Sequence, residues 1–338
     1  MDYKEIFFED KKNCEIPFTH IEKGITDPAL KEIDEMYGAA DVLSFENSKK
    51  HRNNLWLLSF FGTAIAFFFL LYDEAELHWF IFICIVLILF LINTNKLAAY
   101  KGRHRKYVEY RVLAETLRVH YFLSIAGIKN YTSIIFPWFT KKGAPWINEI
   151  LLSLPEYNAS EKREIINCWI RNQREYHEGA LKKATKKKER DDIHTTRALY
   201  ITLATYIIAL GFEVFMLFFN PSGEIHLNIF EVILNTLQNW GIMVGYDQVD
   251  MIRAILKIVI GSMSAFTLFL GSYYGKMSLS NEIDDHRRMI MLYDEAEIEI
   301  LQKGETEELI ISLAQEFLIE NSSWYAYQSK NTPDLTLE

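Results

Sequence analysis

The sequence predicts an all-α membrane protein in which four transmembrane helices form two hairpins and helical cytosolic extensions form a bundle. Four apolar stretches, Leu55–Tyr72, Leu77–Ile92, Ala198–Phe219 and Ile252–Tyr274, each approach the roughly 20 residues that a helix needs to cross a bilayer. Half of the 338 residues are hydrophobic, yet 24% are charged, which is too many for a protein made mostly of membrane helices. The segment Lys96–Thr195 between the hairpins contains no convincing strand pattern.

Basic residues flank each hairpin on one side of the membrane only. The turn 73–76 and the connection 223–250 contain no Lys or Arg, whereas Lys and Arg are frequent before and after both hairpins. By the positive-inside rule, both termini are expected in the cytoplasm. The predicted segments are an N-terminal cytosolic segment (1–50), a first transmembrane hairpin (51–95), a cytosolic helical region (96–195), a second hairpin (196–275) with an outer loop (220–251), and C-terminal cytosolic helices (276–338).

The segments outside the membrane are predicted to be helices. Asn95–Ala126 has no proline and one glycine, so the second membrane helix is expected to continue into the cytosol as a stalk. A short helix is expected around Trp146–Leu154. The next helix, Glu161–Lys188 with Ser160 as its N-cap, is expected to run into the third membrane segment.

The second half of the chain follows the same pattern. The outer connection Asn220–Met251 is expected to lie along the outer surface with solvated acidic residues. The alternative is a re-entrant segment whose acidic side chains, such as Glu224, attract cations. The fourth membrane helix is expected to continue inward through Ser278–Leu301. After a break at Gly304, a last amphipathic helix covers Thr306–Glu320.

Charge and motifs limit the function classes. The net charge of −9 argues against a nucleic-acid partner, and the basic clusters beside the membrane segments are explained by topology and by attraction to lipid headgroups. Membrane lipid is therefore an expected partner. The sequence has no glycine-rich nucleotide loop, no nucleophile elbow, no zinc-protease motif and no paired cysteine spacing. The chain is thus not expected to be an enzyme, and no catalytic residue, metal or cofactor is predicted.

Two charged residues lie inside the second hairpin. Glu213 is six residues before the outer end of the third apolar stretch, and Lys257 is five residues into the fourth, so their depths match within about a turn. An unpaired charge at this depth costs several kcal/mol, which predicts a Glu213–Lys257 ion pair within or between subunits, either in a pore or gate or as a purely structural pair. Gly261, Gly271 and Gly275 allow close helix approach and predict oligomerisation through the fourth helix.

A second set of candidate residues combines charged and aromatic side chains on two cytosolic helices. They are Arg111, Glu115 and Arg118 on one helix and Trp169, Gln173, Tyr176 and His177 on the other. One interpretation is a pocket for a charged small molecule, with the basic groups binding the charge and an aromatic ring stacking on it. The other is an interhelical layer of salt bridges in which the arginines pair with Glu115 or Glu175. His286 is expected to be an ordinary interfacial polar residue.

Four short motifs around the hairpins carry a resemblance to a known family. They are ADVL at Ala40–Leu43, YRVLAETLRV at Tyr110–Val119, WIRNQREYH at Trp169–His177 and ENSSW at Glu320–Trp324. In this order, over about Ala40 to Trp324, the chain resembles the multi-pass membrane proteins of bacterial immunity islands related to SLATT and SLOG-associated effectors. The resemblance implies a protein of the bacterial inner membrane that is triggered during infection. Members often carry a SLOG-type sensor domain, for which Met1–Phe45 is too short, so a separately encoded sensor is expected.

The function expected from this resemblance is that of a homo-oligomeric anti-phage effector. A nucleotide second messenger or a sensor partner acts on its cytosolic helices, and its membrane helices then open a pore or leak ions. The alternative is a non-conducting membrane scaffold that recruits a soluble defence protein through the cytosolic bundle. A third, weaker interpretation is a membrane-embedded hydrolase that uses His104, Glu109 and Glu115.

Overall fold

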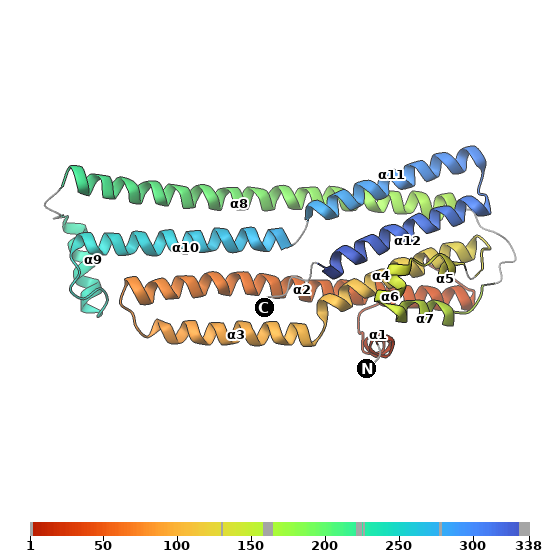
Figure 1. The fold of residues 1–338 in the computed structure, drawn as a ribbon, viewed down its shortest axis with the longest axis horizontal. Coiled ribbons are helices and arrows are strands. Elements are labelled where there is room, and N and C mark those ends of the chain that lie inside the picture. The colour runs from red at the N-terminus through yellow and green to blue at the C-terminus, as the bar shows by residue number, and fades with distance from the viewer. Residues whose placement is uncertain are drawn as a thin grey trace. The chain divides into compact units, whose positions relative to one another are not determined.

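The computed structural model describes residues 3–129, 131–157, 165–220, 225, 227–276 and 279–330. Over these ranges the chain is helical and contains no strand, and four helices are long and apolar enough to cross a membrane. The predicted all-α membrane fold is therefore confirmed. The chain divides into two compact units (Figure 1). The bundle unit comprises Met1–Arg52, Ala98–Ala184 and Asn281–Glu338, and the apolar-helix unit comprises Asn53–Leu97 and Thr185–Ser280.

The apolar-helix unit contains two helical hairpins. They are formed by α2 (Pro28–Glu74) with α3 (Phe80–Tyr100) and by α8 (Asn172–Phe218) with α10 (Gln248–Lys276). The helices lie side by side in the order α3, α2, α10, α8 (Figure 1). Stacked rings of Phe68 and Phe80 join α2 to α3, and a 2.9 Å hydrogen bond between Thr202 and Thr267 joins α8 to α10.

The two hairpins meet along α2 and α10 in one antiparallel register. Gly62 lies against Phe269, and Leu70 lies against Gly261, so eight residues along α2 correspond to eight residues back along α10. A Cβ atom added to Gly261 would be 2.6 Å from Cδ1 of Leu70. Gly261 is thus a helix-packing residue within this chain. An added Cβ at Gly271 or Gly275 would meet no atom within 4 Å, so these two glycines do not provide close packing in a single copy.

The connection between α8 and α10 contains a 12-residue helix, α9 (Asn228–Asn239), which is too short to cross a bilayer. Its Leu234 packs in a small apolar cluster with Ala75, Met243, Met251 and Ala254. The cluster packs α9 against the C-terminal end of α2 and the N-terminal end of α10. Of the acidic residues predicted for this loop, Glu224 lies outside the described residues.

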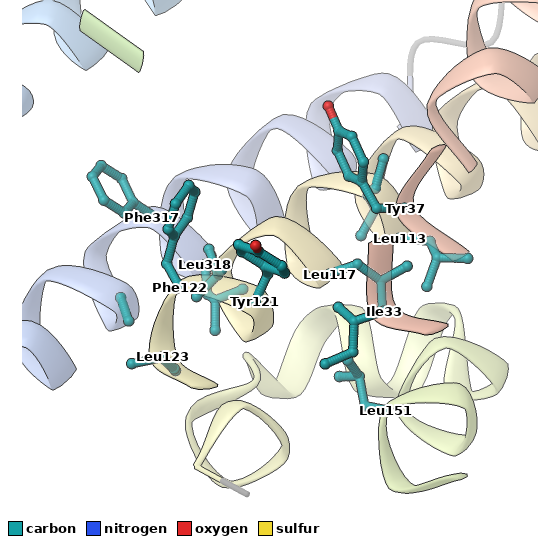
Figure 2. Packing of buried hydrophobic residues seen from close by; sticks show 14 of the residues in the cluster. Ile33, Tyr37, Leu113, Leu117, Tyr121, Phe122, Leu123, Leu151, Phe317 and Leu318 are labelled. Carbon is teal, nitrogen blue, oxygen red and sulfur yellow. The ribbon is translucent and has the colours of Figure 1, made fainter. Parts of the chain in front are cut away.

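The bundle unit packs around α4 (Arg103–Ile125), most of whose side chains are buried. It also contains α1 (Tyr3–Lys12), the first part of α2, α5 (Thr132–Ile135), α6 (Trp138–Gly143), α7 (Pro145–Ser153), η1 (Ile166–Arg171), the start of α8, α11 (Leu279–Lys303) and α12 (Glu307–Lys330). Figure 2 shows Leu113 and Leu117 of α4 near Ile33 of α2, and Phe122 near Phe317 of α12. Apolar residues on several faces of α4 let it serve as the centre of this core.

The helix boundaries correct one expectation and locate the start of the first membrane helix. The predicted stalk is wrong, because α3 ends at Tyr100 and α4 begins at Arg103, with Gly102 between them at φ 57. Glycine adopts this left-handed conformation without steric cost, so a single glycine ends the helix. The first membrane helix begins well before its apolar stretch, at Pro28. There the carboxylate of Asp27 accepts hydrogen bonds from the backbone N–H groups of Ala29 and Leu30 at 2.8 and 3.1 Å.

Several other predicted helices agree with the structure. The helix around Trp146–Leu154 is α7, and Gly304, at φ 77, separates α11 from α12, which extends ten residues beyond its predicted end at Glu320. The proposed cap Ser160, together with the start of that helix, lies outside the described residues. The carboxylate of Glu305 instead accepts hydrogen bonds from the N–H groups of Ile165 and Ile166, at the start of η1, at 2.8 to 3.0 Å. The fourth membrane segment is described as α10 and α11, with 277–278 outside the description.

Candidate functional site

A network of charged and polar side chains is centred on α4 of the bundle unit. Arg111, Glu115 and Arg118 occupy positions i, i+4 and i+7, so they share one face of the helix. The Oε1 atom of Glu115 lies 2.5 Å from Nη2 of Arg111, and its Oε2 atom lies 2.7 Å from Nη1 of Arg118. One carboxylate thus binds two guanidinium groups, and all three side chains are partly buried.

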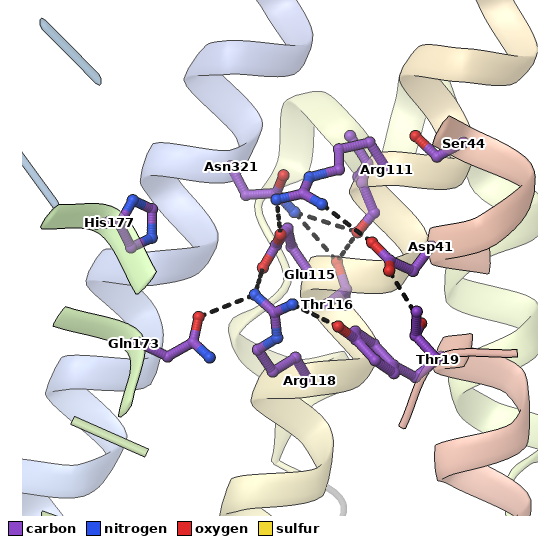
Figure 3. Close-up of polar contacts among 12 residues, drawn as sticks. Thr19, Asp41, Ser44, Arg111, Glu115, Thr116, Arg118, Gln173, His177 and Asn321 are labelled. Carbon is purple, nitrogen blue, oxygen red and sulfur yellow. Dashed lines mark hydrogen bonds and ion pairs between the residues drawn. The ribbon is translucent and has the colours of Figure 1, made fainter. Parts of the chain in front are cut away.

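The network extends to α2. Arg111 donates to Asp41 at 3.1 Å, and the second carboxylate oxygen of Asp41 accepts from the hydroxyl of Thr19 at 2.9 Å. Arg118 donates to the Tyr37 hydroxyl at 2.5 Å. Two carboxylates therefore balance the two arginines, as Figure 3 shows.

Three further helices join the network. From α8, the amide oxygen of Gln173 accepts from Arg118 at 3.0 Å, and Nδ1 of His177 lies 3.0 Å from Nδ1 of His286 on α11. From α12, Asn321 donates to the backbone carbonyl of Val112 at 3.2 Å (Figure 3). Helices far apart in the sequence thus converge on one face of α4. His286 is a member of this cluster and not an ordinary interfacial residue.

The electrostatics keep the network in one charge state near neutral pH. Burial opposes ionisation of Glu115, but Arg111 and Arg118 outweigh that effect and lower the pKa of its carboxyl group. Burial, partly opposed by Glu115, lowers the pKa of His177 to about 4. His177 is therefore neutral at pH 7, where one histidine of the His177–His286 pair donates and the other accepts.

The positions of these side chains bear on the two interpretations of the candidate residues, the ligand pocket and the salt-bridge layer. The structure brings Arg111, Glu115, Arg118, Gln173 and His177 together, and the arginines pair with Glu115 as in the predicted salt-bridge layer. Trp169 is not part of the network: it is buried in the apolar core, where its ring stacks on Phe122 at 5.0 Å between centroids. Tyr176 is half exposed and touches only the ring of His177 among the described aromatic contacts. An anionic ligand at this site would have to displace a carboxylate from an arginine.

The four motifs that carry the family resemblance all contribute to this network. Asp41 comes from the first, the arginines and Glu115 from the second, Gln173 and His177 from the third, and Asn321 from the fourth. Asp41, Tyr37 and Asn321 are not among the predicted site residues. No local spacing relates them to the arginines, and only the motifs contain Asp41 and Asn321. The segment that supplies Asp41 had also not been predicted to be helical.

The residues of the hydrolase interpretation have separate partners. Nε2 of His104 lies 3.1 Å from the carbonyl oxygen of Gln328, whereas Glu109 binds Arg105 at 2.5 Å and the indole N–H of Trp146 at 2.7 Å. Glu115 belongs to the arginine network. Each of the three side chains is thus held in a different set of contacts, which gives no acid–base pair of the kind hydrolysis requires. Among the residues described, no group of three or more His, Cys, Asp or Glu is arranged to hold a metal.

The charges in the apolar-helix unit form a second candidate site. Both carboxylate oxygens of Glu213 bind Arg253 at 2.9 Å, and Nζ of Lys257 binds Glu74 at 3.0 Å. The predicted Glu213–Lys257 pair is therefore not formed within one copy of the chain. Because α10 begins at Gln248, before its apolar stretch, Arg253 lies five residues inside α10, just as Glu213 lies five residues inside the end of α8. Lys257 is one turn deeper and meets the last residue of α2.

Acidification is expected to destabilise the bundle unit. Burial lowers the pKa of His120 to about 4, whereas an unfolded histidine titrates near 6.5. Between these values the unfolded chain binds more protons than the folded chain, so the free energy of unfolding falls as the pH falls and levels off below about 4. For this one residue the slope is at most about 1.4 kcal/mol per pH unit. Thermal melts at pH 7, 6 and 5 measure it.

The matched variants are His120→Gln and His194→Gln, the second at an exposed position of α8. His120→Gln removes one buried titrating group and is expected to flatten the pH dependence, while His194→Gln leaves it as in the wild type. Equal slopes for all three proteins would contradict this account of His120.

Comparison of the chain with protein-family models, with curated proteins and with solved structures gives no match. The function therefore has to follow from the chain's own residues.

Proposed function

We propose that this chain is a homo-oligomeric effector of bacterial anti-phage defence that disrupts the inner-membrane barrier through a pore or ion leak. Both termini lie in the cytoplasm, and a nucleotide second messenger or a separately encoded sensor acts on the bundle unit. The observation that carries the proposal is that charged side chains are exposed on helices long and apolar enough to cross a membrane. In a single copy, only 6–11% of the most apolar part of each helix is buried, and the Glu213–Arg253 pair is about half exposed.

Exposed apolar side chains suit lipid, but exposed charges do not. A charged side chain within the hydrocarbon region costs several kcal/mol unless it faces protein or water. Further copies of the chain would supply such surroundings, and an assembly whose charged faces meet around water conducts ions. This is the physical basis for preferring a leak over a passive anchor.

The arginine network suggests how a signal would reach the membrane helices. Through Asp41 and Gln173 it holds α2 and α8, and these same two helices supply Asn53–Glu74 and Thr185–Phe218 of the apolar-helix unit. A ligand or partner that takes Arg111 from Asp41, or Arg118 from Gln173, changes the packing of both helices on α4. Such a change in two continuous helices is a known route for switching between two states.

Membrane potential during phage infection tests the proposal. Bacteria that express the chain, alone or with its neighbouring genes, are loaded with a voltage-sensitive dye and infected. Depolarisation that depends on the chain and begins after infection is the expected result. Growth arrest with an intact potential would overturn the leak and favour the scaffold. The Gln173→Ala variant, which removes one contact of Arg118, is expected to change the onset of depolarisation, and Leu301→Ala, at an exposed position of α11, serves as its control.

One observation favours the scaffold as a second candidate function. The short helices α5 and α6, which both contact α7, and α7 itself leave Ile134, Trp138 and Leu152 more than two-thirds exposed. Large exposed apolar side chains are typical of protein-binding surfaces. If the chain is a scaffold, Trp138→Ser abolishes protection and the wild-type protein carries no ion flux in liposomes. A wild-type flux that Trp138→Ser leaves intact excludes this role.

A further inference from the structure

We infer that the open side of the α8–α10 pair lines a water-filled path between copies of this chain, with Tyr206, Glu213, Arg253 and Ser264 facing water. This inference rests on the proposed function and deepens it, because it assigns the lining of the leak to one pair of helices.

Contacts between the two helices place these four side chains in one stripe. Glu213 binds Arg253 through both carboxylate oxygens, and the hydroxyl of Tyr206 lies 3.3 Å from that of Ser264. On α8, Tyr206 and Glu213 are seven residues apart, which is two turns, and on α10 Arg253 and Ser264 are eleven residues apart, which is three turns. Each pair therefore shares one side of its helix, and the two cross-helix contacts lie along the same groove.

Burial distinguishes an exposed part of this helix face, the open side of the pair, from a buried part. Thr202, one turn from Tyr206 on the same face of α8, bonds Thr267 through its hydroxyl and is buried at 8% exposure. Tyr206 is 51% exposed, and the side chains of Glu213 and Arg253 are 51% and 42% exposed. Tyr206, Glu213 and Arg253 are thus exposed in one copy of the chain, and Ser264 is partly exposed.

The depth of the stripe excludes lipid headgroups as its only surroundings. Ser264 is eleven residues deeper in α10 than Arg253, which is about 16 Å at 1.5 Å per residue. A stripe of that length begins near the end of the apolar helices and reaches the middle of a hydrocarbon core of about 30 Å. Headgroups can solvate Arg253, but Tyr206 and Ser264 lie beyond their reach.

A second ion pair widens the polar surface on the same helix. Lys257, one turn deeper than Arg253, is 61% exposed while it binds Glu74 of α2. Two acids and two bases therefore lie across α8, α10 and α2 at similar depth. Lys257 lies a turn deeper than Arg253, and covering it with water inside an assembly is less costly than exposing it to hydrocarbon. The occupant that suits this face is water with small ions, enclosed by further copies of the chain.

Reaction of engineered cysteines with a membrane-impermeant thiosulfonate reagent tests the inference. In the full chain with Cys14, Cys84 and Cys168 replaced by alanine, single cysteines are placed at Tyr206 and Ser264. The matched control is Ile208→Cys, two residues from Tyr206 on the opposite side of α8 and 61% exposed. A thiol reacts as the thiolate, which forms in water and not in hydrocarbon. We expect Tyr206→Cys and Ser264→Cys to react at least tenfold faster than Ile208→Cys in membranes.

Ion flux in liposomes that contain the same variants separates this inference from the proposed function. Equal reaction rates at all three positions overturn the water-lined stripe, even if the protein conducts. Fast reaction at Tyr206→Cys and Ser264→Cys without any flux supports the stripe and overturns the leak. Ser264→Cys changes one atom of the side chain, so its reaction rate reports on the native fold where Tyr206→Cys disturbs it.

Discussion

Replacing Gly38 with alanine is expected to destabilise the bundle unit by about 3 kcal/mol or more. The added Cβ would overlap the backbone carbonyl oxygen of Thr19 and lie 3.0 Å from Cβ of Phe18. These atoms cannot swing aside as the end of a side chain can. The segment that contains them is also fastened to α2, because Asp34 accepts from the N–H of Ile21 at 2.7 Å and Asp41 accepts from Thr19. The thermal unfolding midpoint in detergent measures the loss.

The same substitution at Gly179 provides the control. Gly179 lies within α8, and a Cβ added there meets no atom within 4 Å. Alanine is a better helix former than glycine by about 1 kcal/mol, so Gly179→Ala is expected to raise the midpoint. Opposite shifts from one chemical change would show that the close approach at Gly38, and not helix propensity, governs the outcome. A Gly38→Ala protein that melts with the wild type would contradict the packing described for residues 18 and 19.

Arg118→Ala is the second substitution with a large expected effect. The side chain is only 11% exposed and binds three groups: the carboxylate of Glu115, the amide oxygen of Gln173 and the hydroxyl of Tyr37. Its removal leaves Glu115 with Arg111 alone, while Asp41 also depends on that arginine. Breaking a buried ion pair by removing one partner costs about 3 to 5 kcal/mol, because the remaining charge stays desolvated. The unfolding midpoint is expected to fall accordingly.

A surface arginine supplies the comparison. Arg287 pairs with Asp284 at 3.5 Å, and both side chains are more than 60% exposed, so Arg287→Ala is expected to change stability by less than about 1 kcal/mol. Arg118→Lys keeps the charge but replaces the planar guanidinium by a single ammonium, and its midpoint is expected between those of the wild type and Arg118→Ala. Similar midpoints for Arg118→Ala and Arg287→Ala would contradict the role assigned to the network.

Patterns of the apolar residues predicted much of the fold. The four apolar stretches gave the two hairpins, and Gly304 and the segment around Trp146 gave a helix break and a helix that the structure contains. Helix starts set by short polar signals were harder to predict. The Asp27-Pro28 dipeptide is a typical N-cap followed by proline at N1. The residues after it are rich in charge, so no apolar pattern indicated the long helix that follows. At Gly102 the sequence allowed both a continuous helix and a break.

Pairings between distant residues lay beyond sequence analysis. Asp41 and Arg111 are 70 residues apart, and Asn321 reaches α4 across 209 residues, so no local spacing relates them. Charge depth in the membrane helices was predicted only to within a turn. An error of that size assigned Glu213 to Lys257 when Arg253 is its partner. Measured from the helix start at Gln248, Arg253 and not Lys257 matches the depth of Glu213. The apolar stretch alone does not mark that start.

The register between α2 and α10 limits how the two hairpins can move. Large residues on each helix face glycine on the other, with Phe269 at Gly62 and Leu70 at Gly261, and the Lys257–Glu74 pair continues the same alignment. A slide of one helical turn in either direction would remove the glycine from each large side chain and separate the charges. Piston-like translation of α10 along α2 is thus blocked at both ends. Any opening of this layer has to proceed by tilting or swivelling of whole hairpins.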